Sequence, residues 1–229
     1  MAYARRAMTA TTLAPGLEHG VYSYGEAAAV VGVSTQRLRR WADGYTYARK
    51  YDLGIKEAVL QTERRQGVLN FYELIELFFV REYVNLSVPL DDVRRAAKRL
   101  AEEVGPYPFA SADLVVAGRE LLRKGDGDLV NPASQQVVFA YAQDLSEDLT
   151  FLKRLAKRYA PPEYHGRLYL DAGISGGQPV VSEFAVPTRS VYGLWKVEGD
   201  VELVADHYDI SSEEVSAAVR FEAECRKAA

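Results

Sequence analysis

The chain has 229 residues, of which 48% are hydrophobic, and a formal net charge of −4 at pH 7. This length predicts one or two domains with a linker, and the hydrophobic content is sufficient for a buried core. The single cysteine, Cys225, excludes an internal disulfide and fits the reducing cytoplasm, where we expect the protein to be located. No apolar run approaches the roughly 20 residues of a membrane span, so we expect no membrane partner.

Charge is distributed unevenly along the chain. Residues 1–66 carry ten Lys/Arg and six Asp/Glu, whereas residues 163–229 carry six Lys/Arg and twelve Asp/Glu. A basic segment suits a polyanion and an acidic segment does not. Any nucleic acid is therefore expected to bind the N-terminal part. Residues 1–20 lack the apolar core of a signal peptide and are expected to form a flexible tail.

Residues 23–42 are predicted to form two short helices joined by a tight turn. Ser23 and Glu26 have the spacing of a capping box at the start of the first helix. Gly32 can end that helix in the left-handed conformation, and Ser34 is a favourable N-cap for the second helix.

The second of these helices is amphipathic. Leu38, Trp41 and Ala42 share one face, which leaves a basic, amide-bearing outer face. This pattern is typical of a helix-turn-helix whose second helix enters the major groove of DNA, although other helical domains also contain such a pair. We predict DNA contacts, to base edges or phosphates, from Thr35, Gln36, Arg37, Arg39 and Arg40.

Residues 58–62 and 67–71 are predicted to be short strands around a basic tip, which would form a wing beside the helix pair. Arg64 and Arg65 would then lie on the phosphate backbone; an ordinary surface hairpin is the alternative. The preceding segment begins with an Asp-Gly turn and alternates aromatic residues with small and basic ones. It supplies a second group of expected DNA contacts: Tyr45, Tyr47, Arg49 and Lys50.

Two longer helices are predicted next. The first runs from Phe71 to about Leu86 with Asn70 as its cap, and its apolar residues cover more than one face. Such a helix is buried on most sides, in the core and also in a dimer interface. The second helix begins near Pro89 and ends near Val104, and we place a domain boundary near residue 108.

The middle of the chain, residues 108–165, is predicted to be a mixed α/β segment. Residues 114–116 and 121–122 favour strands, and residues 135–142 and 149–159 favour helices. The acidic stretch 125–128 is interpreted as a hairpin turn, because no glutamate follows at the twelfth position of a calcium loop.

The C-terminal part is predicted to contain a strand over residues 167–170 and helices over 188–197, 201–207 and 212–227. Between the strand and the helices lies a Gly-rich loop, residues 173–179. We interpret it as a structural turn rather than a phosphate-binding loop, because no Gly-Lys-Ser/Thr follows it.

These residues together resemble two known families. The N-terminal part resembles the MerR-like winged helix-turn-helix, and the C-terminal part resembles a small antitoxin-associated helical domain of unknown function. The chain as a whole is similar to VapB-type antitoxins with a MerR-like N-terminal domain. The N-terminal resemblance lies in residues 24–28, 33–34, 38–41 and 69–77, and the C-terminal one in residues 177–181, 186–188, 204–211 and 214–222. The run 183–187 departs from the Gly-Thr-Arg-Ile-Pro that the C-terminal domain often carries, and the dimerising coiled coil of MerR proteins is not recognisable.

The resemblance implies a mainly α fold with small β elements. A winged helix-turn-helix would span residues 21–107, the mixed α/β segment 108–165 would join it to the rest, and a small helical domain would span 166–229. It also implies a repressor that binds the operator DNA of its own operon as a homodimer. The C-terminal part would neutralise a cognate PIN-domain ribonuclease toxin.

The main alternative is a stand-alone MerR-like regulator, whose C-terminal half binds a small effector or mediates oligomerisation. Tyr141, Phe151 and Trp195 would line its pocket, or else pack in the core. Catalysis is not expected: the three histidines are far apart in sequence, and no nucleophile, zinc or paired-carboxylate motif is present. We therefore predict no catalytic residues, no metal and no cofactor.

Overall fold

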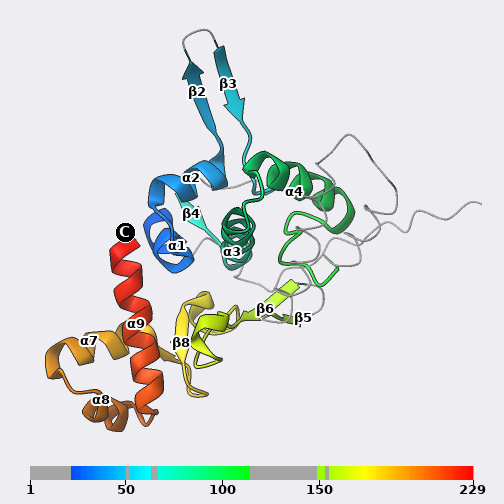
Figure 1. Cartoon of the computed structure of the whole chain (residues 1–229). Helices are drawn as coiled ribbons and strands as arrows, with labels where there is room; N and C mark the ends of the chain where they lie inside the picture. Colours follow the sequence, from blue (N-terminus) through cyan, green and yellow to red (C-terminus); the bar gives the residue numbers. More distant parts are fainter. Residues whose placement is uncertain (1–21, 50–51, 63–66, 114–148, 153–154, 229) are drawn as a thin grey trace, which may run out of the picture.

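The computed structural model describes residues 22–49, 52–62, 67–113, 149–152 and 155–228 (Figure 1). These residues form a mainly α-helical structure with small β elements, as the sequence predicts. The expected tail, the basic tip at 63–66 and the elements expected between 114 and 142 lie outside the described residues. Within the described ranges, no helix combines the length and apolar character needed to cross a membrane.

The two short helices at the start are confirmed. Helix α1 (Tyr24–Val31) begins with the Ser23 capping box and ends at Gly32, which has a φ of 74°. Helix α2 (Thr35–Asp43) begins at Ser34, whose side chain accepts a hydrogen bond from the amide of Arg37. The predicted inner face of α2 is buried: Leu38, Trp41 and Ala42.

The expected wing is wrong in position. The hairpin consists instead of β2 (Tyr45–Arg49) and β3 (Asp52–Lys56), which pair antiparallel and extend away from the helices (Figure 1). Strand β4 (Val68–Leu69) pairs with β1 (Tyr22–Ser23), and residues 58–62 form no strand. The reason is burial: Val59 and Leu69 are fully inaccessible, so these segments are held in the core.

Helix α3 (Phe71–Asn85) is the centre of the N-terminal part, and it begins with an Asn70 capping box. Most of its side chains are buried, as predicted. Its neighbours in this chain include α1, α2, β6 and α4 (Leu90–Val104). Contacts within one chain therefore bury much of the α3 surface that we expected a dimer interface to bury.

A five-stranded antiparallel sheet follows, with its strands in chain order: β5 (Leu149–Leu152), β6 (Leu155–Tyr159), β7 (Leu168–Asp171), β8 (Pro179–Val181) and β9 (Val186–Pro187). The helix predicted over 149–159 is therefore wrong. Its apolar residues fit a helical period, but a short apolar segment fits a strand equally well, and antiparallel pairing with a neighbouring strand decides the outcome here. The boundary expected between residues 165 and 166 falls between two strands of this sheet.

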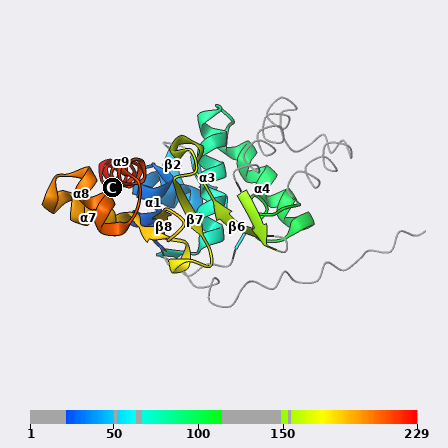
Figure 2. The ribbon, with the colours of Figure 1, turned by 90° about the horizontal axis from the view of Figure 1, so that it is seen from below.

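Three helices complete the chain, and all three were predicted. They are α7 (Thr188–Glu198), α8 (Val201–Tyr208) and α9 (Ser212–Ala228). Seen from below, α9 lies next to α1 (Figure 2). The last helix of the chain therefore packs directly against the first.

The Gly-rich loop joins the sheet to the N-terminal helices. It contains a 3-10 turn, Ser175–Gly177. The Tyr22 hydroxyl donates a hydrogen bond of 2.5 Å to the Gly177 carbonyl. A Cβ at Gly177 would lie 2.5 Å from Cδ2 of Phe71. In the described structure the Gly-rich loop therefore forms a structural turn, as the sequence predicts.

Candidate nucleic-acid interface

The outer face of α2 is exposed and basic. Gln36, Arg37, Arg39 and Arg40 are all exposed, whereas Leu38 between them is buried. Since the first turn of α2 contains no acidic residue, nothing within that turn opposes an anion at the positive end of the helix dipole. Thr35, half-buried at the first helical position, lies at this end.

Each arginine of this face lies over an aromatic ring. Arg37 Cζ is 5.7 Å from the ring centroid of Trp41. Arg40 Cζ is 5.2 Å from the centroid of Tyr45. Such cation–π contacts restrain a guanidinium at the surface while leaving its N–H groups available to a ligand. Arg39 lies over Tyr24 of α1 at 5.5 Å, and so on a different flank of the helix.

Two glycines position hairpin β2–β3 beside α2. Gly44 ends α2 with a φ of 72°, and a Cβ there would collide with the Lys56 carbonyl. Gly54 is paired with Tyr47 across the hairpin, and a Cβ at Gly54 would collide with the tyrosine ring. The Tyr47 ring therefore lies across Gly54, with the ring of Tyr45 6.4 Å away.

The base of the hairpin is attached to α4 by charged residues that the sequence analysis missed. Asp91 pairs with Lys56 of β3 and, at 2.8 Å, with Arg94. Arg94 Nε also donates to the Glu57 carbonyl at 2.6 Å. The hydrogen bond from Lys56, with that from Arg94, holds the pKa of Asp91 below its usual value. No local pattern reveals this cluster, because Lys56 and Asp91 are 35 positions apart.

The structure brings only some of the predicted DNA contacts together. Gln36, Arg37, Arg40 and Tyr45 line one groove of about 440 Å³, with Trp41 on its wall. Tyr47 lies on β2, in the hairpin that begins at the end of α2 and extends away from it (Figure 1). Arg49 is the last residue of β2, whereas Lys50, Arg64 and Arg65 lie outside the described residues.

Among the described residues, no metal-holding group is found, and two of the aromatic side chains considered for an effector pocket pack against the core. No group of three His, Cys, Asp or Glu side chains within the described residues is arranged to hold a metal. Burial raises the pKa of the Cys225 thiol to about 12, so this group is not a thiolate nucleophile near neutral pH. Phe151 on β5 and Trp195 on α7 both pack against the core, and Tyr141 lies outside the described residues.

Comparison with known proteins relates the chain to a curated protein and to a solved structure. No family model matches the chain. The chain is 26% identical over 216 residues to a Mycobacterium tuberculosis protein named "Putative antitoxin VapB45", and the match covers 85% of this chain and 90% of that protein. The crystal structure of Rv2018 from Mycobacterium tuberculosis has a TM-score of 0.68 and 21% sequence identity, covering 88% of this chain and 98% of that one. The structural likeness identifies the fold, and the sequence likeness relates the chain to a protein named as an antitoxin.

Proposed function

We propose that this protein is the antitoxin of a type II toxin–antitoxin pair. It binds operator DNA as a homodimer, represses its own operon and neutralises a PIN-domain ribonuclease toxin through its C-terminal part. The observation that carries the proposal is the similarity to the protein named VapB45 over most of both chains. The basic face of α2 supports the DNA-binding half of the proposal.

DNA binding is assigned to α2 and hairpin β2–β3, which together act as a MerR-like winged helix-turn-helix. Helix α2 enters the major groove, where Arg37 and Arg40 read guanine and Gln36 reads adenine. Thr35 and Arg39 contact phosphates. The hairpin takes the place of the wing, with Tyr45, Tyr47, Arg49 and Lys50 on the backbone. Arg64 and Arg65 remain a proposal for phosphate contacts.

The experiment that tests this function is growth after induction of the adjacent gene, alone and together with this one. Growth arrest by the neighbour, relieved by this protein, supports the antitoxin function. A fluorescence anisotropy titration with the upstream DNA then tests repression of the operon. A harmless neighbour, or growth arrest without relief, would contradict the antitoxin function.

A stand-alone regulator with a small effector is the second candidate. It is favoured by a groove of about 660 Å³ between α1, α7 and α9. Glu26 and Arg189 line this groove beside the apolar side chains of Ala29, Val30 and Phe221. An effector bound there would contact both the helix-turn-helix and the C-terminal helices. A change in operator affinity caused by a small molecule, without any toxin, would favour this candidate.

A further inference from the structure

The turn between α7 and α8 exposes two large apolar side chains. Val197 in the last turn of α7 is 79% exposed, and Leu203 in the first turn of α8 is 46% exposed. The core contacts of these helices are made by other residues, among them Val191 and Val204, which are fully buried. One exposed apolar residue is ordinary, but two that flank one turn indicate a surface for another protein.

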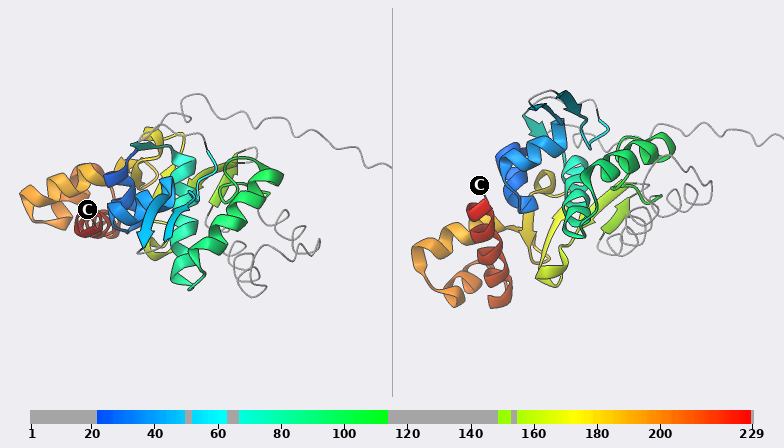
Figure 3. Two further views of the ribbon diagram at one scale, coloured as in Figure 1. Left: turned by 90° about the horizontal axis from the view of Figure 1, so that it is seen from above. Right: turned by 45° about the horizontal axis from the view of Figure 1, so that its top comes forward.

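This turn lies in the most acidic part of the chain. Residues 197–214 contain seven Asp/Glu and no Lys or Arg. The exposed members include Glu198, Glu202 and Asp206. Helix α2 lies away from α7 and α8 (Figures 1 and 3). The sign of the charge excludes nucleic acid and anionic lipid as partners here, and it opposes the same face of a second copy.

A hollow of about 620 Å³ opens beside this turn, between the 3-10 turn η1 (Pro162–Tyr164), α8 and α9. Glu163, Glu202 and Glu213 are among its lining residues. Arg220 also lines the hollow, but its Nη2 donates to the Glu163 carbonyl at 2.5 Å and its Cζ lies 4.4 Å from the Tyr164 ring centroid. His165 and Arg167 line the hollow as well, so its lining combines acidic and basic side chains. The charge preference of this region therefore comes from the exposed carboxylates of the turn itself, among them Glu202.

We propose that the α7–α8 face, defined as Val197, Glu198, Glu202, Leu203 and Asp206, binds a basic surface on a partner protein. Val197 and Leu203 enter an apolar depression, and the three carboxylates face lysines and arginines around it. The inference rests on the proposed function in one respect: the partner is the ribonuclease toxin. A basic surface on a ribonuclease faces RNA, so this face neutralises the toxin by competing with RNA.

The apolar contribution is tested with purified full-length protein and the product of the adjacent gene, by biolayer interferometry. The double variant Val197→Ser/Leu203→Ser should bind at least about 10-fold more weakly. The matched control is Ile55→Ser/Leu86→Ser, because Ile55 is 77% and Leu86 42% exposed and both lie in the N-terminal part. The control should bind like the wild type, and circular dichroism should show that both variants are folded.

The charge contribution is tested with Glu198→Lys/Asp206→Lys. Both positions are in the last turn of their helices, where a lysine is favourable toward the helix dipole, so the fold should be retained. The variant should associate more slowly than the wild type, and its association rate should depend less on salt. A short RNA oligonucleotide should compete with the wild-type protein for the toxin.

The outcomes separate this inference from the proposed function. If the wild-type protein does not bind the adjacent gene product, the proposed function fails and this inference fails with it. If the wild type binds, and if the Val197→Ser/Leu203→Ser and Glu198→Lys/Asp206→Lys variants bind as well as the wild type, the α7–α8 face is not the contact surface. If the variants instead change the sedimentation of the protein alone, the face joins two copies of the chain, which also overturns the inference.

Discussion

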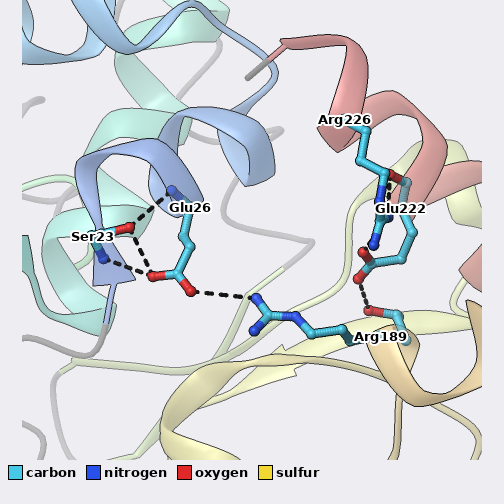
Figure 4. Close-up of polar contacts among 6 residues, drawn as sticks. Ser23, Glu26, Arg189, Glu222 and Arg226 are labelled. Atoms are coloured by element: carbon cyan, nitrogen blue, oxygen red, sulfur yellow. Dashed lines mark hydrogen bonds and ion pairs between the residues drawn. The ribbon is translucent and has the colours of Figure 1, made fainter. Parts of the chain in front are cut away.

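Arg189 in the first turn of α7 forms an ion pair with Glu26 in the first turn of α1, with 3.4 Å between Nη2 and Oε1 (Figure 4). Glu26 simultaneously accepts a hydrogen bond of 2.9 Å from the backbone amide of Ser23. A C-terminal residue thus contacts the capping box that begins the first helix of the N-terminal pair. Beside it, Thr188 donates to Glu222 at 2.7 Å, so the start of α7 is bonded to α1 and to α9.

Replacing Arg189 by Ala should lower the free energy of unfolding by less than about 1 kcal/mol, because its side chain is 63% exposed and exposed pairs are screened by solvent. Replacing Glu26 by Ala should cost about 1 kcal/mol, since it also removes half of a capping box. Urea denaturation measures both. Glu214→Ala, at the equivalent position of the Ser211 capping box, is the control and should cost about as much as Glu26→Ala.

The loss of unfolding free energy caused by Glu26→Ala should also depend on pH. The backbone hydrogen bond from Ser23, together with Arg189, lowers the pKa of Glu26 below 4.5. A carboxyl whose pKa falls on folding contributes stability above its unfolded pKa and loses it as the pH falls through the folded value. The difference between wild type and Glu26→Ala should therefore shrink below about pH 4.5. A difference that stays constant in acid would contradict this role for the carboxylate.

Gly177→Ala should be among the most destabilising small substitutions in the chain. The residue has a φ of 88°, and the new Cβ would lie 2.5 Å from Phe71 and 2.9 Å from the Tyr22 hydroxyl. Backbone strain and overpacking each cost roughly 1–3 kcal/mol. Gly166→Ala separates them, because Gly166 has a φ of 76° with nothing within 4 Å of the new Cβ. Thermal unfolding should show a clearly larger loss at position 177, and equal losses would mean that the close packing contributes nothing.

Helix starts were predicted reliably because their signals are local. Ser23 and Glu26, three positions apart, form the expected capping box. Asn70 is the expected cap of α3, and the structure adds a capping box with Glu73. The strands over 149–159 were missed because their apolar spacing fits both periods, and only the pairing of β6 with β7 distinguishes them. The wing was misplaced because Val59 and Leu69 are residue types that favour strands, whereas both are buried in the core.

The candidate site was predictable in part for the same reason. Gln36 and Arg40 were predicted on the outer face of one short helix, with Arg37 on its flank, and all three are exposed. Lys56 and Asp91 were not predicted, because nothing within either segment indicates the other. The packing of Gly177 against Tyr22 is likewise a contact between residues 155 positions apart. Long-range contacts of this kind carry no periodic signal in a single sequence.

Glu76→Gln should change how stability depends on pH. Glu76 is 1% exposed, and its carboxyl accepts a hydrogen bond of 2.7 Å from the Ala110 amide. Burial raises its pKa well above 4.5, against the opposing effect of that hydrogen bond. The folded state therefore holds a proton that the unfolded state releases, and stability falls as the pH rises from the unfolded toward the folded pKa.

The uncharged glutamine removes this loss of stability. The free energy of unfolding of the variant should therefore increase relative to that of the wild type as the pH rises above 4.5, by up to about 1.4 kcal/mol per pH unit. Chemical denaturation across the pH range measures the difference. Glu102→Gln, at an exposed position on α4, is the control. Parallel curves for wild type and Glu76→Gln would mean that the carboxyl ionises equally in both states.

Arg40→Ala should weaken specific binding to operator DNA by roughly 1–3 kcal/mol, because its guanidinium lies on the exposed face of α2 and is restrained by Tyr45. Lys98→Ala is the control: this exposed cation lies on α4, where it pairs with Glu57 at 3.6 Å, and its loss should leave operator affinity unchanged. Fluorescence anisotropy with operator and scrambled duplexes distinguishes two roles for Arg40. A base contact should relax sequence preference, whereas a phosphate contact should weaken both duplexes alike and lower the salt dependence. Equal affinities for Arg40→Ala and wild type on both duplexes would place this arginine outside the interface.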